Sequence, residues 1–211
     1  DYRSNFGEDL NYLSPYRYVK NNDYAGQYIE IGNRTNRTME NMSSNLARLL
    51  YHELAHANDF YPQNMHANIQ GPTLKDEFNR RFDGKEMTSD QLNIRYPLTS
   101  TEMYALASVQ YSGENANNTQ KAYTPSDVAL FFSSDLANDD YAYSSTREDV
   151  AMLFEEVMMS HRYGILRDIA ITDKPEIETS STIVVEWGQR GRVGQPELND
   201  RASYVLSQIL P

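Results

Sequence analysis

The stretch Tyr51-His52-Glu53-Leu54-Ala55-His56 lies inside a long helical pattern. Apolar residues recur on both sides of it at steps of three and four, which is the period of an amphipathic helix, and Pro62 ends the pattern. We therefore expect a helix of roughly residues 40 to 60. Three leucines of this helix are expected to anchor it in the core, namely Leu49, Leu50 and Leu54.

The same stretch contains the pattern His-Glu-x-x-His. Two histidines four residues apart on a helix project from nearly the same face, so both imidazoles can bind one metal ion. Glu53 projects beside such an ion, where its carboxylate can take a proton from a water molecule. The pattern predicts a zinc site with His52 and His56 as ligands and Glu53 as the catalytic base; the alternative is that all three are ordinary helix residues.

Length and composition narrow the class of protein. A chain of 211 residues suits one domain, and we expect a cleft between portions 1–70 and 120–211. No apolar run is long enough for a membrane span, and a net charge of −11 disfavours binding to nucleic acid or to anionic lipid. The absence of cysteine excludes thiolate metal sites and cysteine nucleophiles.

The remaining pattern indicates a helix-dominated α+β fold. β-branched runs predict strands at 27–32 and 182–187. A second strong helix is expected over 145–161, with Gly164 just beyond its end, and a closing amphipathic helix over 196–210.

Short helices are expected in the middle third, because capping boxes recur there. These boxes pair Thr88 with Gln91, Thr99 with Glu102, and Thr124 with Asp127 behind Pro125. Between them, the Gly- and Asn-rich stretch 112–120 is expected to be a surface loop.

The third ligand distinguishes the classes of zinc peptidase. Metzincins place a Gly and a third His after the second His, where this chain has Asp59 and Pro62, so that class is excluded. Thermolysin-like enzymes use a Glu about twenty residues further on, which corresponds here to Asp76 or Glu77 without the expected Asn-Glu-Ala signature. The histidines outside the motif, His66 and His161, are further candidates.

Two patches together resemble a known family. The motif from His52 to Asp59, followed by Tyr141 and then by Glu148 with Ala151 behind it, resembles the zinc peptidases of the anthrax lethal factor type. It is equally similar to the bacterial peptidases of the Mlc titration factor type. The resemblance implies that Glu148 is the third zinc ligand and that Tyr141 donates a hydrogen bond in the transition state.

Several positions leave these roles open. Tyr143 competes with Tyr141 as the donor, and Met152 stands where some relatives carry a second Glu. Glu148 is also spaced correctly to complete a capping box with Ser145, and the adjacent Asp149 is an alternative ligand. Asp59 is either an acceptor that orients a ligand imidazole or a helix-end carboxylate.

The function implied by this resemblance is zinc-dependent endopeptidase activity on a peptide or protein substrate. Two alternatives stay open: a zinc-dependent amidase or deformylase acting on a small substrate, and an inactive zincin-fold binding module. The cysteine-free acidic composition, rich in Tyr, Asn and Ser, is typical of secreted or cell-envelope proteins of bacteria. In the segment 186–192, the Trp and two Arg are expected to belong to a strand end and a Gly turn, or else to contact a partner.

Overall fold

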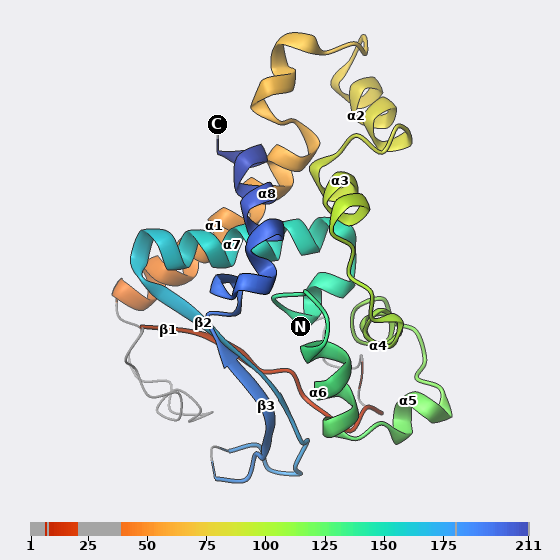
Figure 1. Ribbon diagram of the computed structural model, residues 1–211, viewed down its shortest axis with the longest axis vertical. Coiled ribbons are helices and arrows are strands. Elements are labelled where there is room, and N and C mark those ends of the chain that lie inside the picture. Colours follow the sequence, from red (N-terminus) through yellow and green to blue (C-terminus); the bar gives the residue numbers. More distant parts are fainter. Residues whose placement is uncertain (1–6, 8, 21–38, 180, 211) are drawn as a thin grey trace.

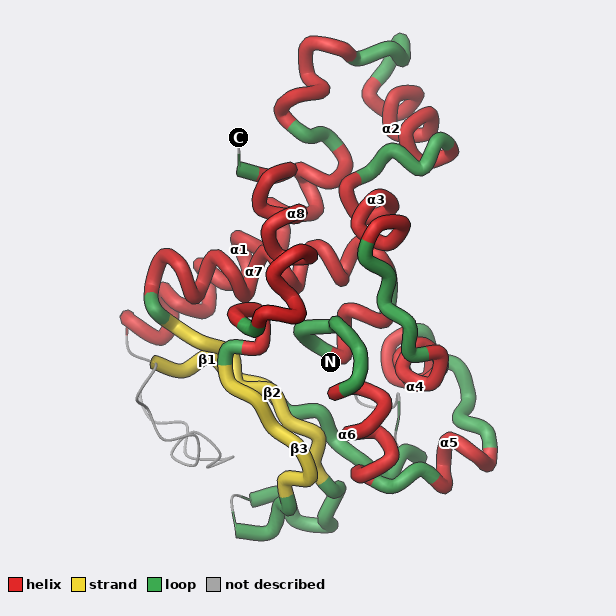
Figure 2. The backbone as a smooth tube through the Cα atoms, viewed as in Figure 1, coloured by secondary structure: helices red, strands yellow, loops and turns green. Residues whose placement is uncertain are grey.

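The computed structural model describes residues 7, 9–20, 39–179 and 181–210. Its elements in chain order are β1 (Tyr16–Lys20), α1 (Met39–Phe60), the 3-10 helix η2 (Gln63–Asn68), α2 (Leu74–Asp83), α3 (Thr88–Arg95), α4 (Thr101–Tyr111), α5 (Asn118–Ala122), α6 (Pro125–Ser133), η3 (Asp140–Tyr143), α7 (Thr146–Tyr163), β2 (Ile165–Thr172), β3 (Val185–Arg190), η4 (Arg192–Gly194), η5 (Pro196–Leu198) and α8 (Asn199–Ile209). One small sheet lies beside α6 and below α7 at the edge of a mostly helical molecule (Figure 1, Figure 2), so the expected helix-dominated α+β class is confirmed. None of the helices described is both long and apolar enough to cross a lipid bilayer.

The sheet has three antiparallel strands in the order β1-β2-β3. Alternate side chains of the central strand β2 are buried, as expected for a strand with one covered face. Neither β1 nor β2 was predicted. The predicted strand 182–187 begins later, because Thr182 belongs to a turn in which its hydroxyl accepts a hydrogen bond from the backbone N–H of Thr179 (2.8 Å). The predicted strand 27–32 lies outside the described residues.

Helix α7 is the central element of the fold. It packs against α1, α3, α8, η3 and β2, and Figure 1 shows it crossing the middle of the molecule. The expected helix is confirmed at both ends: Ser145 Oγ accepts a hydrogen bond from the backbone N–H of Glu148 (3.2 Å), and Gly164 ends the helix in the left-handed conformation (φ 62°). The closing helix is also confirmed, as η5 followed by α8.

The core has two clusters of buried apolar side chains. One lies among α4, α6, η3 and β2, and it includes Leu106, Val128, Phe132, Tyr143 and Ile169. The other lies among α1, α3, α7 and α8, and it includes Ala55, Leu92, Leu153, Phe154 and Val205. Helix α7 contributes side chains to the second cluster. It also packs against β2, whose buried isoleucines belong to the first cluster.

The expected anchoring of α1 by its leucines is wrong. The helix forms as predicted, but Leu49, Leu50 and Leu54 are 48%, 54% and 41% exposed. Among the positions of α1 whose burial is described, the buried ones are Ala55 and Asp59, because the side that packs against α7 is the side with small and polar residues. The apolar stripe of α1 therefore faces outward among the described residues.

Two of the three expected caps are wrong. Helix α3 begins at Thr88 itself, with Met87 in the cap position. Helix α4 is capped by Ser100, whose Oγ accepts from the backbone N–H of Met103 (3.3 Å), while the Thr99 hydroxyl donates to Asp135 Oδ1 (3.2 Å) instead. The third box is confirmed.

That third box pairs Thr124 with Asp127 in both directions, with Pro125 as the first helical residue. The stretch 112–120 is only partly a loop, because Asn117 caps the short helix α5 within it.

The segment 186–192 is internally packed. Trp187 makes an edge-to-face contact with Phe132 (5.3 Å between ring centroids), and Arg190 pairs with Asp168 on the neighbouring strand. Arg192 donates to the carbonyl oxygens of Ala137 (2.7 Å) and Asp135 (2.6 Å). These contacts agree with a strand end and a turn.

Candidate metal centre

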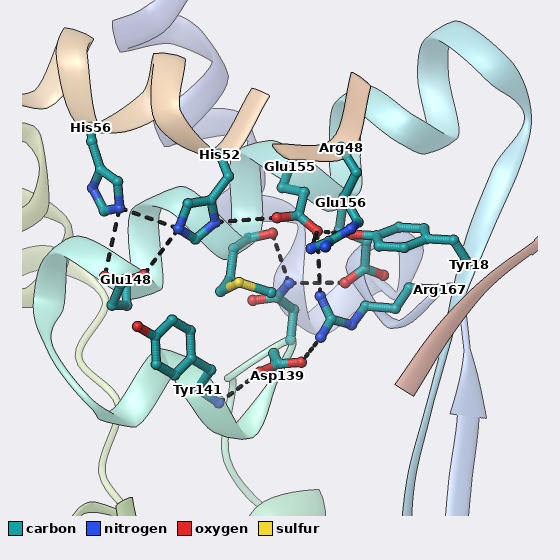
Figure 3. A network of polar contacts seen from close by, with 12 residues as sticks. Tyr18, Arg48, His52, His56, Asp139, Tyr141, Glu148, Glu155, Glu156 and Arg167 are labelled. Carbon is teal, nitrogen blue, oxygen red and sulfur yellow. Dashed lines mark hydrogen bonds and ion pairs between the residues drawn. The ribbon is translucent and has the colours of Figure 1, made fainter. Parts of the chain in front are cut away.

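The two histidines of α1 face the first turn of α7. The Nε2 atoms of His52 and His56 are 3.2 Å apart. Glu148 Oε2 lies 3.1 Å from the first and Glu148 Oε1 lies 3.6 Å from the second (Figure 3). One ligand atom from each of the three residues lies within 4.8 Å of the others, so the side chains predicted to share a metal converge.

The capping interaction of Glu148 does not compete with this contact. The backbone N–H of Glu148 donates to Ser145 Oγ, while its carboxylate faces the histidines. The two roles use different atoms of one residue. A position in the first helical turn therefore holds the carboxylate at a fixed place opposite α1.

Charges within this group perturb its pKa values. Burial alone lowers the pKa of His52, but the contacts with Glu148 and Glu155 outweigh it and raise this pKa to about 9. Burial opposes ionisation of Glu148, yet His52 and His56 lower its pKa to about 2. Without a metal, the imidazolium of His52 thus lies between two carboxylates.

The three side chains fit a zinc ion. Two imidazole nitrogens and one carboxylate are ligands that zinc prefers, and three protein ligands are typical of catalytic zinc sites. The buried Glu148 Oε2 contacts His52 Nε2 (3.1 Å), which is itself a proposed ligand atom. Both atoms therefore face the same point, where a metal ion would replace their mutual contact.

A second carboxylate of α7, Glu155, completes the surroundings of His52 and was missed in the sequence. Its Oε2 lies 3.1 Å from His52 Nδ1, the ring nitrogen turned away from Glu148. Its Oε1 accepts hydrogen bonds from the Tyr18 hydroxyl (2.7 Å) and from Arg48 Nη1 (3.2 Å). Glu155 follows Glu148 by two helical turns, which places both carboxylates on the same face of a helix. This spacing could have indicated Glu155 from the sequence.

A cavity of about 520 Å³ opens beside the three ligands. Its wall includes the exposed Glu53, and Tyr141 from η3. Figure 3 shows the Tyr141 hydroxyl directed toward Glu148, and the ring packs edge-to-face on Tyr111 (4.8 Å between centroids). The predicted base and donor thus line one cavity with the predicted ligands.

The competing donor Tyr143 lies in the core instead. It is 2% exposed, and its hydroxyl donates to Asp135 Oδ2 (2.9 Å). It is not among the residues that line the cavity.

The alternative carboxylate ligands make contacts elsewhere. Asp149 is buried against Arg201, and Asp76 accepts a hydrogen bond from the Thr73 hydroxyl (2.6 Å). Glu77 accepts hydrogen bonds from the backbone N–H groups of residues 70 and 71 and pairs with Arg80. These carboxylates therefore have structural partners of their own.

Three further candidates also have other surroundings. His66 contacts the carbonyl oxygen of Tyr61 (3.0 Å), and His161 is exposed on the last turn of α7. Asp59 accepts hydrogen bonds from the backbone and the hydroxyl of Ser89 (2.8 and 2.7 Å). The acceptor that contacts a ligand imidazole is Glu155 rather than Asp59.

Comparison of the chain with family models, with curated proteins and with solved structures found no match. The likeness to the lethal factor and Mlc titration factor types therefore depends on the two sequence patches alone.

Proposed function

We propose that this protein is a zinc-dependent endopeptidase. The observation that carries the proposal is the convergence of His52, His56 and Glu148 beside a cavity whose wall also includes Glu53 and Tyr141. A cavity of about 520 Å³ falls within the usual range for bound ligands, and a short stretch of peptide is of that size.

Each side chain has a role that follows from its chemistry. His52, His56 and Glu148 would hold the metal, and a bound zinc ion would supply Lewis acidity toward water and toward a substrate carbonyl. Glu53 takes a proton from the attacking water and returns it to the leaving amine. Tyr141 donates a hydrogen bond to the carbonyl oxygen as negative charge develops there.

Glu155 has a supporting role in this proposal. Its carboxylate accepts from His52 Nδ1, which fixes the tautomer that presents Nε2 toward the metal. The ring is then held in its binding orientation before the metal arrives.

The test compares wild-type protein with Glu53→Gln. Protein purified without a chelating resin should contain close to one zinc per chain. Wild type should cleave casein. Glu53→Gln should keep its zinc, because all three ligands remain, but it should cleave casein about 10²-fold or more slowly, because the catalytic base is gone.

The other outcomes separate the alternatives. Cleavage of small amides without cleavage of casein would indicate an amidase. Zinc without any hydrolysis would indicate a binding module, and a chain that takes up no zinc would contradict the proposal altogether.

A further inference from the structure

A buried arginine lies between the two halves of this site. Arg167 occupies the inward row of β2, where Ile165 and Ile169 flank it at alternate positions, and it is 1% exposed. Its guanidinium lines the cavity, and the Tyr16 ring covers it at 3.9 Å from Cζ to the ring centroid. A fully buried Arg in an apolar row requires partners, since an uncompensated buried charge is costly.

Its partners are carboxylates on two different elements. Nη2 pairs with Asp139 Oδ2, and Nη1 lies 3.8 Å from Glu155 Oε1 (Figure 3). The second contact is longer than a hydrogen bond, so Coulomb attraction in a buried setting joins these two groups.

Glu155 and Asp139 contact different parts of the site. Glu155 contacts Nδ1 of the ligand His52 (3.1 Å). Asp139 is the N-cap of η3, and its Oδ1 accepts a hydrogen bond from the backbone N–H of Tyr141 (2.6 Å). One guanidinium therefore stands between the metal ligand of α1 and the donor of η3.

We propose that Arg167 is a positioning residue that couples the orientation of His52 to the placement of Tyr141. This inference rests on the proposed function. Arg167 contributes a positive charge between the buried Asp139 and Glu155 carboxylates, which offsets the cost of burying both near one another. Without it, their mutual repulsion and desolvation displace Glu155 from His52 and Asp139 from its cap, and both ends of the site loosen together.

Zinc affinity of the whole chain gives the first readout, measured by competition with a chromophoric chelator. Arg167→Met should weaken zinc binding by about 10- to 100-fold, which is the usual effect of losing support behind a ligand. The matched control is Arg201→Met, because Arg201 is also 1% exposed and pairs with a buried carboxylate, Asp149, that is not part of the cavity wall. The control should lose stability without weakening zinc binding.

Asp139→Asn separates positioning from simple loss of structure. Asp139 contacts no proposed ligand in the described hydrogen bonds and ion pairs, and Arg167 is the residue that joins it to Glu155 behind His52. We expect zinc to bind about 10-fold more weakly to Asp139→Asn than to wild type. The zinc affinity of Asp149→Asn should be unchanged. Unchanged zinc affinity in Asp139→Asn would overturn the coupling, even if Arg167→Met failed to fold.

Turnover at saturating zinc tests the effect of Arg167 on the placement of Tyr141. Arg167→Met and Tyr141→Phe should each lower kcat by about 10²-fold, and the double variant should be no slower than the slower single variant. Fully additive losses would mean that the two residues act independently, which would contradict the inference. If zinc-loaded wild type showed no hydrolysis, the proposed function would be wrong. The role of Arg167 behind His52 would still be decided by the zinc affinities of Arg167→Met and Asp139→Asn relative to their controls.

Discussion

Glu148 and Glu155 lie two turns apart on α7, and they contact the two ring nitrogens of a single imidazole, that of His52. Glu148 Oε2 is 3.1 Å from Nε2, and Glu155 Oε2 is 3.1 Å from Nδ1. Because both carboxylates belong to one helix, the placement of α7 against α1 fixes the orientation of this ring. Protonation of this ring and binding of a metal to it are consequently linked.

Zinc binding should release a proton from His52. Because the pKa of this residue is raised to about 9 in the metal-free protein, the imidazolium form predominates at pH 7 and must deprotonate before it can bind a metal. The apparent zinc affinity should therefore rise by about tenfold per pH unit between pH 6.5 and 9. Calorimetry in buffers of different ionisation enthalpy measures the released proton, and a slope near zero across this interval would contradict the assignment.

The stability of the metal-free protein should fall at both ends of the pH scale. His52 has a raised pKa, so its contribution is complete below its unfolded value of 6.5 and is lost as the pH rises through about 9. Glu148 has a lowered pKa, so its contribution is complete above 4.5 and is lost as the pH falls through about 2. The pKa shifts of His52 and Glu148 arise largely from the contact between these two residues. The stability of the metal-free protein should therefore be highest between pH 4.5 and 6.5. Urea unfolding in the presence of a chelator measures this profile, which should flatten in Glu148→Gln.

Glu148→Ala should weaken zinc binding by about 10²-fold or more, because it removes one of three ligands. Asp149→Asn and Glu77→Gln are the matched acidic controls, and they should leave zinc affinity unchanged while lowering the free energy of unfolding, because each of these carboxylates has structural partners. Equilibrium dialysis with zinc and thermal unfolding together provide the measurement. Strong zinc binding in Glu148→Ala would exclude it as a ligand.

The two tyrosines near η3 should respond differently to loss of the hydroxyl. Tyr141→Phe should lower kcat by about 10²-fold with little change in stability, because its hydroxyl faces the cavity. Tyr143→Phe should cost about 1 kcal/mol of unfolding free energy and leave kcat nearly unchanged, because its hydroxyl bonds the buried Asp135. Steady-state kinetics and thermal unfolding of both variants give the comparison, and a reversed pattern would transfer the donor role.

Local sequence signals predict much of the helical framework but not the surroundings of the site. The helix with His52 and His56 follows from periodicity, and the cap at Ser145 and the Gly164 terminus define α7. Its spacing from Glu148 could have indicated Glu155, but its partners Tyr18 and Arg48 are remote in sequence, and the fold brings them together.

The central strand was missed for a related reason. An Arg at position 167 interrupts what would otherwise be an apolar row, and charged residues are rarely fully buried unless they are paired. The side of α1 that packs inward was also mispredicted, since periodicity defines an apolar face without identifying its neighbour. Long-range pairing is the part of the structure that single-residue patterns do not contain.

The exposed leucines of α1 have a consequence for how long the three proposed metal ligands stay together. Within the part of the chain that the structure describes, the main packing partner of α1 lies on one side only, whereas α7 is covered on several sides. Helix α1 should therefore undergo local unfolding at a lower free energy than α7. Its backbone amides should accordingly exchange with deuterium before those of α7. The residence time of the assembled ligands is then limited by fluctuations of the helix that carries both histidines.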